Sequence, residues 1–209
     1  MVVSKDEKEV NEEKCLQNQT TSDNFEIILQ KATELFAGKG YDAVGIQEVF
    51  TASGITKPTL YYYFKSKTGL LEAIINDKGS KLVYSTKVAL FYEHEFFDSL
   101  LKVLKSTRDF AEENPDYFRL HLNLLASPKD SEGYKIFEIV REQLSDTFLQ
   151  FFKDSAAEFG NMRGKENLYA VIFCNLVNQT VLAFLNGELT LDDDMSYKIV
   201  HSFIWGVAS

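Results

Sequence analysis

The segment from residue 45 to residue 67 is rich in side chains that can hydrogen-bond to anions and to planar heterocyclic rings. Its positions that we single out for contact are Gly45, Gln47, Thr56, Lys57, Pro58, Thr59, Tyr61, Tyr62, Tyr63 and Lys67. Hydroxyl and ammonium groups of this kind bind phosphate oxygens, and threonine and tyrosine can also touch the edges of bases. The chemistry that this pattern predicts is non-covalent contact with a nucleic acid.

Two short helices joined by a tight turn would place these groups on one surface. Gly54 stands where the first helix would end in a left-handed residue, a conformation that glycine adopts without steric cost. Thr56 can cap the second helix, and Pro58 falls in its first turn, where a missing N–H does no harm. Apolar residues on one face of each helix can attach it to a core: Ile46, Val49 and Phe50, then Leu60 and Phe64.

This stretch resembles the DNA-binding domain of the TetR family of bacterial transcriptional regulators. The resemblance covers about residues 23 to 81 and rests on several coupled elements in register: a helix ending at Phe36 and Gly40, Ser53-Gly54-Ile55, Thr59-Leu60-Tyr61-x-x-Phe64, and Lys67 with Leu70. It implies double-stranded operator DNA as the partner. It further implies that Tyr61 and Lys67 contact phosphates, while Lys57, Thr59 and Tyr62 project toward the bases.

Three positions depart from the family pattern. Val44-Gly45 stands where threonine or serine commonly begins the first of the two helices, so we expect no side-chain cap there. Phe50 replaces a small alanine and must repack the core locally or cover a larger hollow. Pro58 replaces a more frequent glycine. None of these changes removes the motif.

The net charge of −9 over 209 residues is unusual for a protein that contacts a polyanion, but the charge is unevenly distributed. Residues 1–24 carry three lysines and six acids, for −3, and residues 25–82 carry seven lysines and six acids, for +1. Subtraction leaves −7 for residues 83–209. A weakly basic segment under an acidic remainder would orient the molecule on DNA without strong indiscriminate binding.

Apolar residues keep a helical period along most of the chain, which predicts an all-α fold of about nine to ten helices. We expect a flexible charged tail at 1–21, a DNA-binding domain at 22–82 with its helix-turn-helix at 45–64, and a helical ligand-binding and dimerisation domain at 83–209. Ser66 can cap a fourth helix that leads into the second domain. Breaks are expected at Asn114-Pro115 and Ser127-Pro128, and one phenylalanine-rich helix is expected from Glu132 to Phe159.

The segment Leu168–Leu185 is apolar on most of its sides, so it needs two packing partners. The family resemblance implies a homodimer formed through 166–186 and 194–208, whereas a monomer with one fully buried helix is the alternative. Aromatic residues between 91 and 159 suit an ordinary core, although the resemblance implies a site there for a small-molecule effector. Tyr117 and His121, one helical turn apart, are the candidate ligand contacts.

No catalytic motif, metal-binding pattern or cofactor fingerprint is present, so we expect no enzyme, no metal and no cofactor. Two cysteines and the lack of a signal-peptide pattern favour the cytoplasm, and we expect no membrane contact. The predicted function is that of a ligand-responsive, dimeric transcriptional repressor. A transcriptional activator, a regulator with a protein partner, and a helical ligand-binding dimer without DNA recognition remain alternatives.

Overall fold

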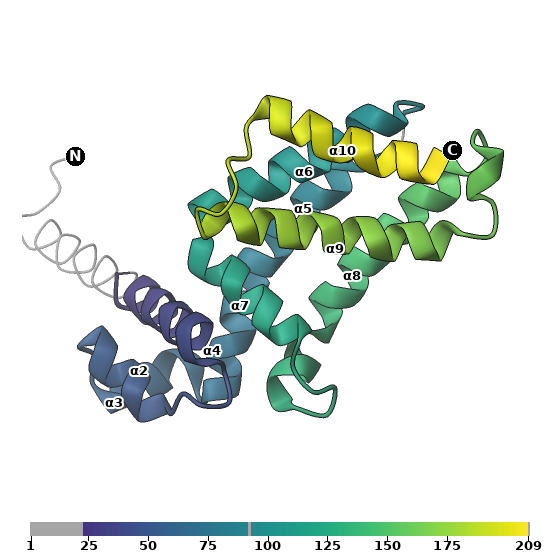
Figure 1. Cartoon of the computed structure of the whole chain (residues 1–209). Helices are drawn as coiled ribbons and strands as arrows, with labels where there is room; N and C mark the ends of the chain where they lie inside the picture. The colour runs from purple at the N-terminus through teal and green to yellow at the C-terminus, as the bar shows by residue number, and fades with distance from the viewer. Residues whose placement is uncertain (1–22, 92, 209) are drawn as a thin grey trace, which may run out of the picture.

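Every regular element in the described part of the chain, residues 23–91 and 93–208 of a computed structural model, is helical (Figure 1). The all-α prediction is therefore confirmed, while the tail predicted for 1–21 lies outside the described residues. The N-terminal domain holds a helix over residues 23–39, α2 (Ile46–Ser53) and α3 (Lys57–Phe64). Its core is formed by residues at helical spacing that are buried, among them Ile28, Ala32, Phe36, Val49 and Leu60.

Phe50 occupies the edge of this core and is only partly buried against it. The large side chain therefore covers the core from the side and does not fill an interior hollow.

A single helical rod connects the two halves of the molecule. In this connecting helix, α4 (Lys67–Ile74) continues through a π-helical turn, η1 (Ile75–Gly79), into α5 (Ser80–Ala89). The backbone at the first junction stays right-handed helical, since Ile75 has φ −66° and ψ −40°. Ser66 caps the N-terminus, because its Oγ accepts a hydrogen bond from the Gly69 N–H at 2.9 Å. The predicted domain boundary at 82/83 falls inside this helix, so the two halves share a rigid element.

The C-terminal body, residues 93–208, packs around the upper half of the connecting helix (Figure 1). Its elements are α6 (Phe96–Glu113), α7 (Pro115–Leu125), α8 (Glu132–Ser155), the short 3-10 turn η2 (Gly160–Met162), α9 (Glu166–Leu185) and α10 (Asp193–Ala208). The breaks expected at Asn114-Pro115 and Ser127-Pro128 are both found. The corner between α7 and α8, residues 126–132, extends down to the level of the N-terminal domain.

The end of α8 differs from the prediction, because the helix stops at Ser155 and Phe159 lies in the turn beyond it. Gly160 and Asn161 follow at once, and both residue types favour turns over helix interiors. Phe159 still contacts the buried Phe96 from the turn, with the ring centres 5.1 Å apart, although its own side chain is exposed.

Two apolar clusters hold the molecule together. One joins the N-terminal domain to the connecting helix, α7 and the first half of α8, and the other fills the space among α6, the second half of α8, α9 and α10. Because the first cluster crosses the predicted domain boundary, a shift in α7 or α8 can be transmitted to the N-terminal domain through packed side chains.

Candidate functional site

The turn between α2 and α3 has the geometry that a helix-turn-helix requires. Gly54 ends α2 in the left-handed region, with φ 68° and ψ 13°. Thr56 caps α3, since its Oγ1 accepts from the Thr59 N–H at 3.4 Å, and Pro58 lies in the first turn. Gly45 precedes α2 and contributes no side-chain cap, as its residue type predicts. These local interactions fix the angle at which α3 leaves the turn.

One face of α3 is open to solvent and carries most of the predicted contact residues. Tyr62 projects furthest, with 78% of its surface exposed, and Tyr61 is 38% exposed beside it. The Lys57 ammonium lies 5.8 Å from the centre of the Tyr61 ring, so charge and hydroxyl groups occupy one patch. Five other predicted contacts are exposed or half-buried, two at the start of α2 and three at the start of α3: Gly45, Gln47, Thr56, Pro58 and Thr59. The buried residues Leu60 and Phe64 hold the opposite face against the core.

Two of the predicted contact residues are engaged inside the protein. Tyr63 is half-buried, and its ring packs edge-on against Phe25 with the centres 5.9 Å apart. The Lys67 ammonium lies 4.0 Å from the centre of the Tyr41 ring, and partial burial lowers the pKa of this lysine. The predicted contact residues therefore differ in how accessible they are. Those on the outer face of α3 are exposed, whereas Tyr63 packs against Phe25 and Lys67 contacts the aromatic ring of Tyr41.

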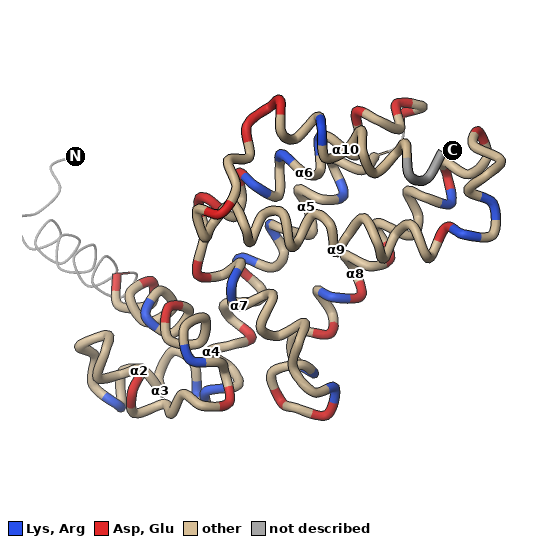
Figure 2. The backbone as a smooth tube through the Cα atoms, viewed as in Figure 1, with Lys and Arg blue, Asp and Glu red and all other residues tan. Residues whose placement is uncertain are grey.

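The charges are distributed as the segment count predicts (Figure 2). Lys57 begins α3 and Lys65 and Lys67 follow its end, whereas a run of three acids, Asp192 to Asp194, lies at the start of α10 in the body. Such an asymmetry favours approach of the N-terminal domain to a polyanion.

In the body, the two candidate ligand contacts lie in the core. Tyr117 and His121 are each 2% exposed, and neither Tyr117 Oη nor His121 Nδ1 has a hydrogen-bond partner among the described residues. Burial lowers the pKa of His121 to about 4, so the imidazole is neutral at physiological pH. The rings nearest to this pair belong to Phe110, Phe118 and Phe137. Buried polar atoms are normally hydrogen-bonded, so the lack of partners sets these two atoms apart from the rest of the core.

The connecting helix packs closely against Tyr117 at Gly79. A Cβ atom at Gly79 would lie 2.7 Å from Tyr117 Oη and 2.9 Å from Val140 Cγ2. The φ of Gly79 is −64°, so glycine is required here for space and not for backbone conformation. The same residue closes the π-helical turn, an irregularity that often marks functional positions in helices.

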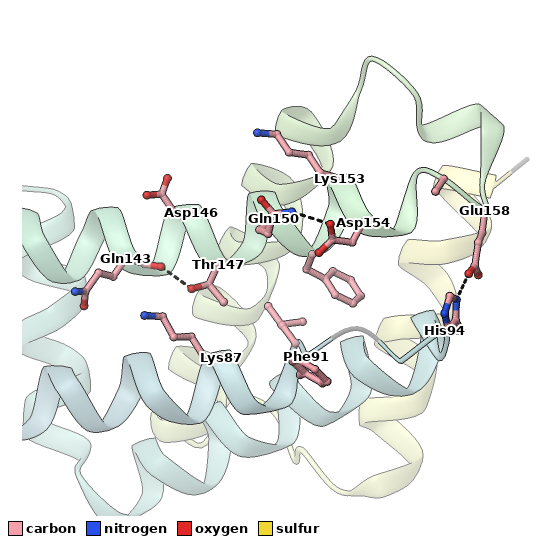
Figure 3. A pocket seen from close by; sticks show the side chains of 13 residues that line it. Lys87, Phe91, His94, Gln143, Asp146, Thr147, Gln150, Lys153, Asp154 and Glu158 are labelled. Carbon is pink, nitrogen blue, oxygen red and sulfur yellow. Dashed lines mark hydrogen bonds and ion pairs between the residues drawn. The ribbon is translucent and has the colours of Figure 1, made fainter.

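A separate open groove of about 930 Å³ runs between α5 and α8 (Figure 3). Lys87 and Phe91 form one wall, Gln143, Thr147 and Gln150 form the other, and a His94–Glu158 pair lies at one end. Neither Tyr117 nor His121 lines this groove. Our sequence reasoning did not identify it, although polar residues at positions 143, 147 and 150 recur at helical spacing on one face of α8.

Helix α9 has apolar residues on two opposite faces. Phe173, Val177 and Val181 are buried in the body, while Leu168, Val171 and Ile172 are 44–54% exposed. Helix α10 adds Tyr197 and Trp205 to the exposed apolar surface. Among the described helices, α9 alone is long and apolar enough to cross a membrane by composition, a test that a packed helix of a globular protein also passes.

Comparison with known proteins assigns these features to one family. The family model described as "Bacterial regulatory proteins, tetR family" matches residues 28–74. The transcriptional activator FasR of Mycolicibacterium smegmatis is 25% identical over 86% of this chain and 80% of its own. The negative transcriptional regulator IcaR of the Staphylococcus aureus biofilm operon is 26% identical over 61% of this chain and 69% of its own.

A solved structure gives the same result for the fold. A candidate fatty acid metabolism regulator of Clostridium perfringens superposes with a TM-score of 0.70 over 87% of this chain and 96% of its own, at 19% identity. The helix-turn-helix geometry, the family match and these relatives agree, and the chain belongs to the TetR family of bacterial transcriptional regulators.

Proposed function

We propose that the protein acts as a homodimer that sets the α3 helix of each subunit into the major groove of a palindromic operator, and that a small-molecule effector controls this binding. The observation that carries the proposal is the exposed face of α3, where Tyr62, Lys57 and Thr56 project from a helix whose opposite face is buried. A helix with this arrangement can enter the groove without disturbing its own core.

The α3 residues divide into two roles. Lys57, Thr59 and Tyr62 are the candidates for base discrimination, because they are exposed or half-exposed on the outer face of α3 and carry groups that hydrogen-bond or touch thymine methyls. Tyr61 and Lys67 are the candidates for phosphate contact, which positions the protein without selecting a sequence.

Operator selection from random-sequence duplexes, followed by binding measurements on the selected and scrambled duplexes, tests these roles. Tyr62→Ala should reduce the difference in binding free energy between the selected and the scrambled duplex by about 1 to 3 kcal/mol per contacted base. Tyr61→Phe, which removes only a hydroxyl group, should lower the affinity for both duplexes by similar factors. An unchanged specificity ratio in a folded Tyr62→Ala variant would refute base discrimination by this residue.

The homodimer is supported by the second apolar face of α9 and by the exposed aromatic residues of α10. A two-fold axis across these helices would join them with their copies and hold two α3 helices at a fixed separation. Half-sites about one helical turn of DNA apart then require both subunits for tight binding.

The effector is proposed to bind beside Tyr117 and His121, whose Oη and Nδ1 atoms are buried without a hydrogen-bond partner among the described residues, with Tyr117 Oη lying close to Gly79 of the connecting helix. A ligand there changes operator affinity only if it binds one arrangement of the two N-terminal domains better than the other, and the operator must then weaken or strengthen effector binding by the same factor. We propose that the protein represses the genes it controls. We also propose that it acts in the cytoplasm. Because relatives include an activator as well as a negative regulator, a transcription assay with the selected operator decides the sign.

A further inference from the structure

The corner between α7 and α8 contacts the N-terminal domain directly, in addition to the contact made by the connecting helix. Glu132, the first residue of α8, accepts two hydrogen bonds: Tyr41 Oη donates to its Oε2 at 2.6 Å, and Thr68 Oγ1 donates to its Oε1 at 2.9 Å. Close by, Asn123 Nδ2 donates to the backbone oxygen of Ala37 at 2.9 Å. The body thus places a carboxylate against the first turn of α4.

This first turn of α4 is a place where an anion is favoured. The N–H groups at a helix start are not all paired within the helix and carry partial positive charge. Lys67 and Thr68 add an ammonium and a hydroxyl group at the same end. Such a combination binds phosphate as well as carboxylate.

The Glu132 carboxylate is charged in this position. The hydrogen bond from Tyr41, reinforced by that from Thr68, lowers the pKa of Glu132, and the positive charge of Lys67 acts in the same direction. Lys67 itself lies over the Tyr41 ring, the ring whose hydroxyl donates to Glu132. One aromatic side chain therefore holds the lysine and the carboxylate in the same small volume.

We propose that Glu132 is an autoinhibitory residue that competes with an operator phosphate for the N-terminus of α4. With Glu132 bound to Thr68, its exposed carboxylate places a negative charge beside the start of α4 that acts on Lys67, and a DNA phosphate must displace this carboxylate or share that end of the helix with it. A body conformation that withdraws the start of α8 would release Lys67 and the first turn of α4 for DNA. The inference rests on operator binding through the N-terminal domain, and it adds a contact that the effector domain controls directly.

A charge-removing variant with a matched control tests the proposal. Glu132→Gln removes the negative charge at α4 and keeps an oxygen that can accept a hydrogen bond. Asp130→Asn removes one acid from the same corner, but Asp130 is exposed and makes no hydrogen bond or ion pair within the described residues. Both variants change the net charge by the same amount, so they separate a local contact from a general charge effect.

Affinity for the selected operator, measured over a range of salt concentrations, is the readout. Glu132→Gln should tighten binding by about two- to fivefold per subunit, the effect expected when one exposed charge near a phosphate contact is removed. The plot of the logarithm of the binding constant against the logarithm of salt concentration should also become steeper, by about the amount that one additional phosphate contact per subunit contributes. Asp130→Asn should change neither quantity beyond the small effect of net charge. Adding Lys67→Ala to each background should cost more affinity in Glu132→Gln than in the wild type.

Equal effects of Glu132→Gln and Asp130→Asn would overturn the proposal, as would weaker operator binding by a Glu132→Gln variant that melts at the wild-type temperature. If Glu132→Gln unfolds, Tyr41→Phe serves as the second variant, because it removes one hydrogen bond to Glu132 and should also tighten binding. Failure of the wild-type protein to distinguish operator from scrambled DNA would instead overturn the proposed function itself.

Discussion

Replacing Gly79 with alanine should act as a permanent displacement of the connecting helix. The new Cβ would lie 2.7 Å from Tyr117 Oη and 2.9 Å from Val140 Cγ2, whereas ordinary van der Waals contact begins at 3.4 Å. The helix and the body must therefore separate by about 0.7 Å at this point, the difference between 3.4 and 2.7 Å. Both neighbours are buried, so neither can move aside into solvent.

The displacement grows toward the N-terminal domain. At a rise of about 1.5 Å per residue, Gly79 is about 15 Å from the end of α5 and about 18 Å from the start of α4. If the upper end stays fixed in the body, a shift of about 0.7 Å at Gly79 becomes about 1.5 Å at Lys67, which exceeds the tolerance of a hydrogen bond to a phosphate. We therefore expect Gly79→Ala to weaken operator binding by about 5- to 150-fold, the usual range of allosteric coupling.

Stability should change much less than operator affinity. Overpacking costs about 1 to 3 kcal/mol, and the better helix propensity of alanine returns about 1 kcal/mol. Gly38→Ala is the matched control, since Gly38 lies in the helix over residues 23–39 and a Cβ added there would have no neighbouring atom within 4 Å. Adding Tyr117→Phe and Val140→Ala to Gly79→Ala should restore much of the binding. Wild-type operator affinity in the Gly79→Ala variant would refute the role assigned to this contact.

Two other predictions concern the core and the dimer. The pKa of His121 in the folded protein, about 4, lies below its ordinary value of 6.5, so between these two pH values His121 is protonated in the unfolded chain but not in the folded protein. The contribution of the neutral, buried His121 to the free energy of unfolding should thus be fully present at pH values above 6.5 and should fall by about 2 kcal/mol as the pH drops to 5. Urea titrations should show this loss in the wild type but not in His121→Leu. Ile172→Glu on the exposed face of α9 should dissociate the proposed dimer in sedimentation and abolish tight operator binding, whereas Ile139→Glu, at an exposed apolar position of α8, should do neither.

The local signals in the sequence were sufficient for the helix-turn-helix, because each depends on only a few neighbouring residues. Gly54 takes the left-handed conformation, and both Thr56 and Ser66 cap the helices that follow them. The phenylalanine stripe correctly predicted α8 but not its end, since Phe159 lies in the turn beyond the helix and contacts Phe96 from there.

Features that depend on contacts between distant segments could not be predicted in this way. The contact between Tyr41 and Glu132 joins residues 91 positions apart, and neither residue type announces a partner. The close approach of Tyr117 to the π-helical turn at Ile75–Gly79 likewise joins residues of two different helices, and the sequence around Gly79 gives no sign of it. Helical periodicity identified the faces of the helices, whereas tertiary packing decided which polar atoms meet.

The two connections between the body and the N-terminal domain act at opposite ends of α4. Gly79 meets Tyr117 just above the C-terminal end of α4, and Glu132 meets Thr68 at its N-terminal end. A rotation of the connecting helix about one contact must therefore strain or break the other, so the two cannot vary independently. The hydrogen bonds to the exposed Glu132 carboxylate contribute about 1 kcal/mol together. Allosteric coupling energies are typically about 1 to 3 kcal/mol. Breaking the Glu132 contact can thus supply a substantial part of the energy by which the proposed effector beside Tyr117 would change operator affinity.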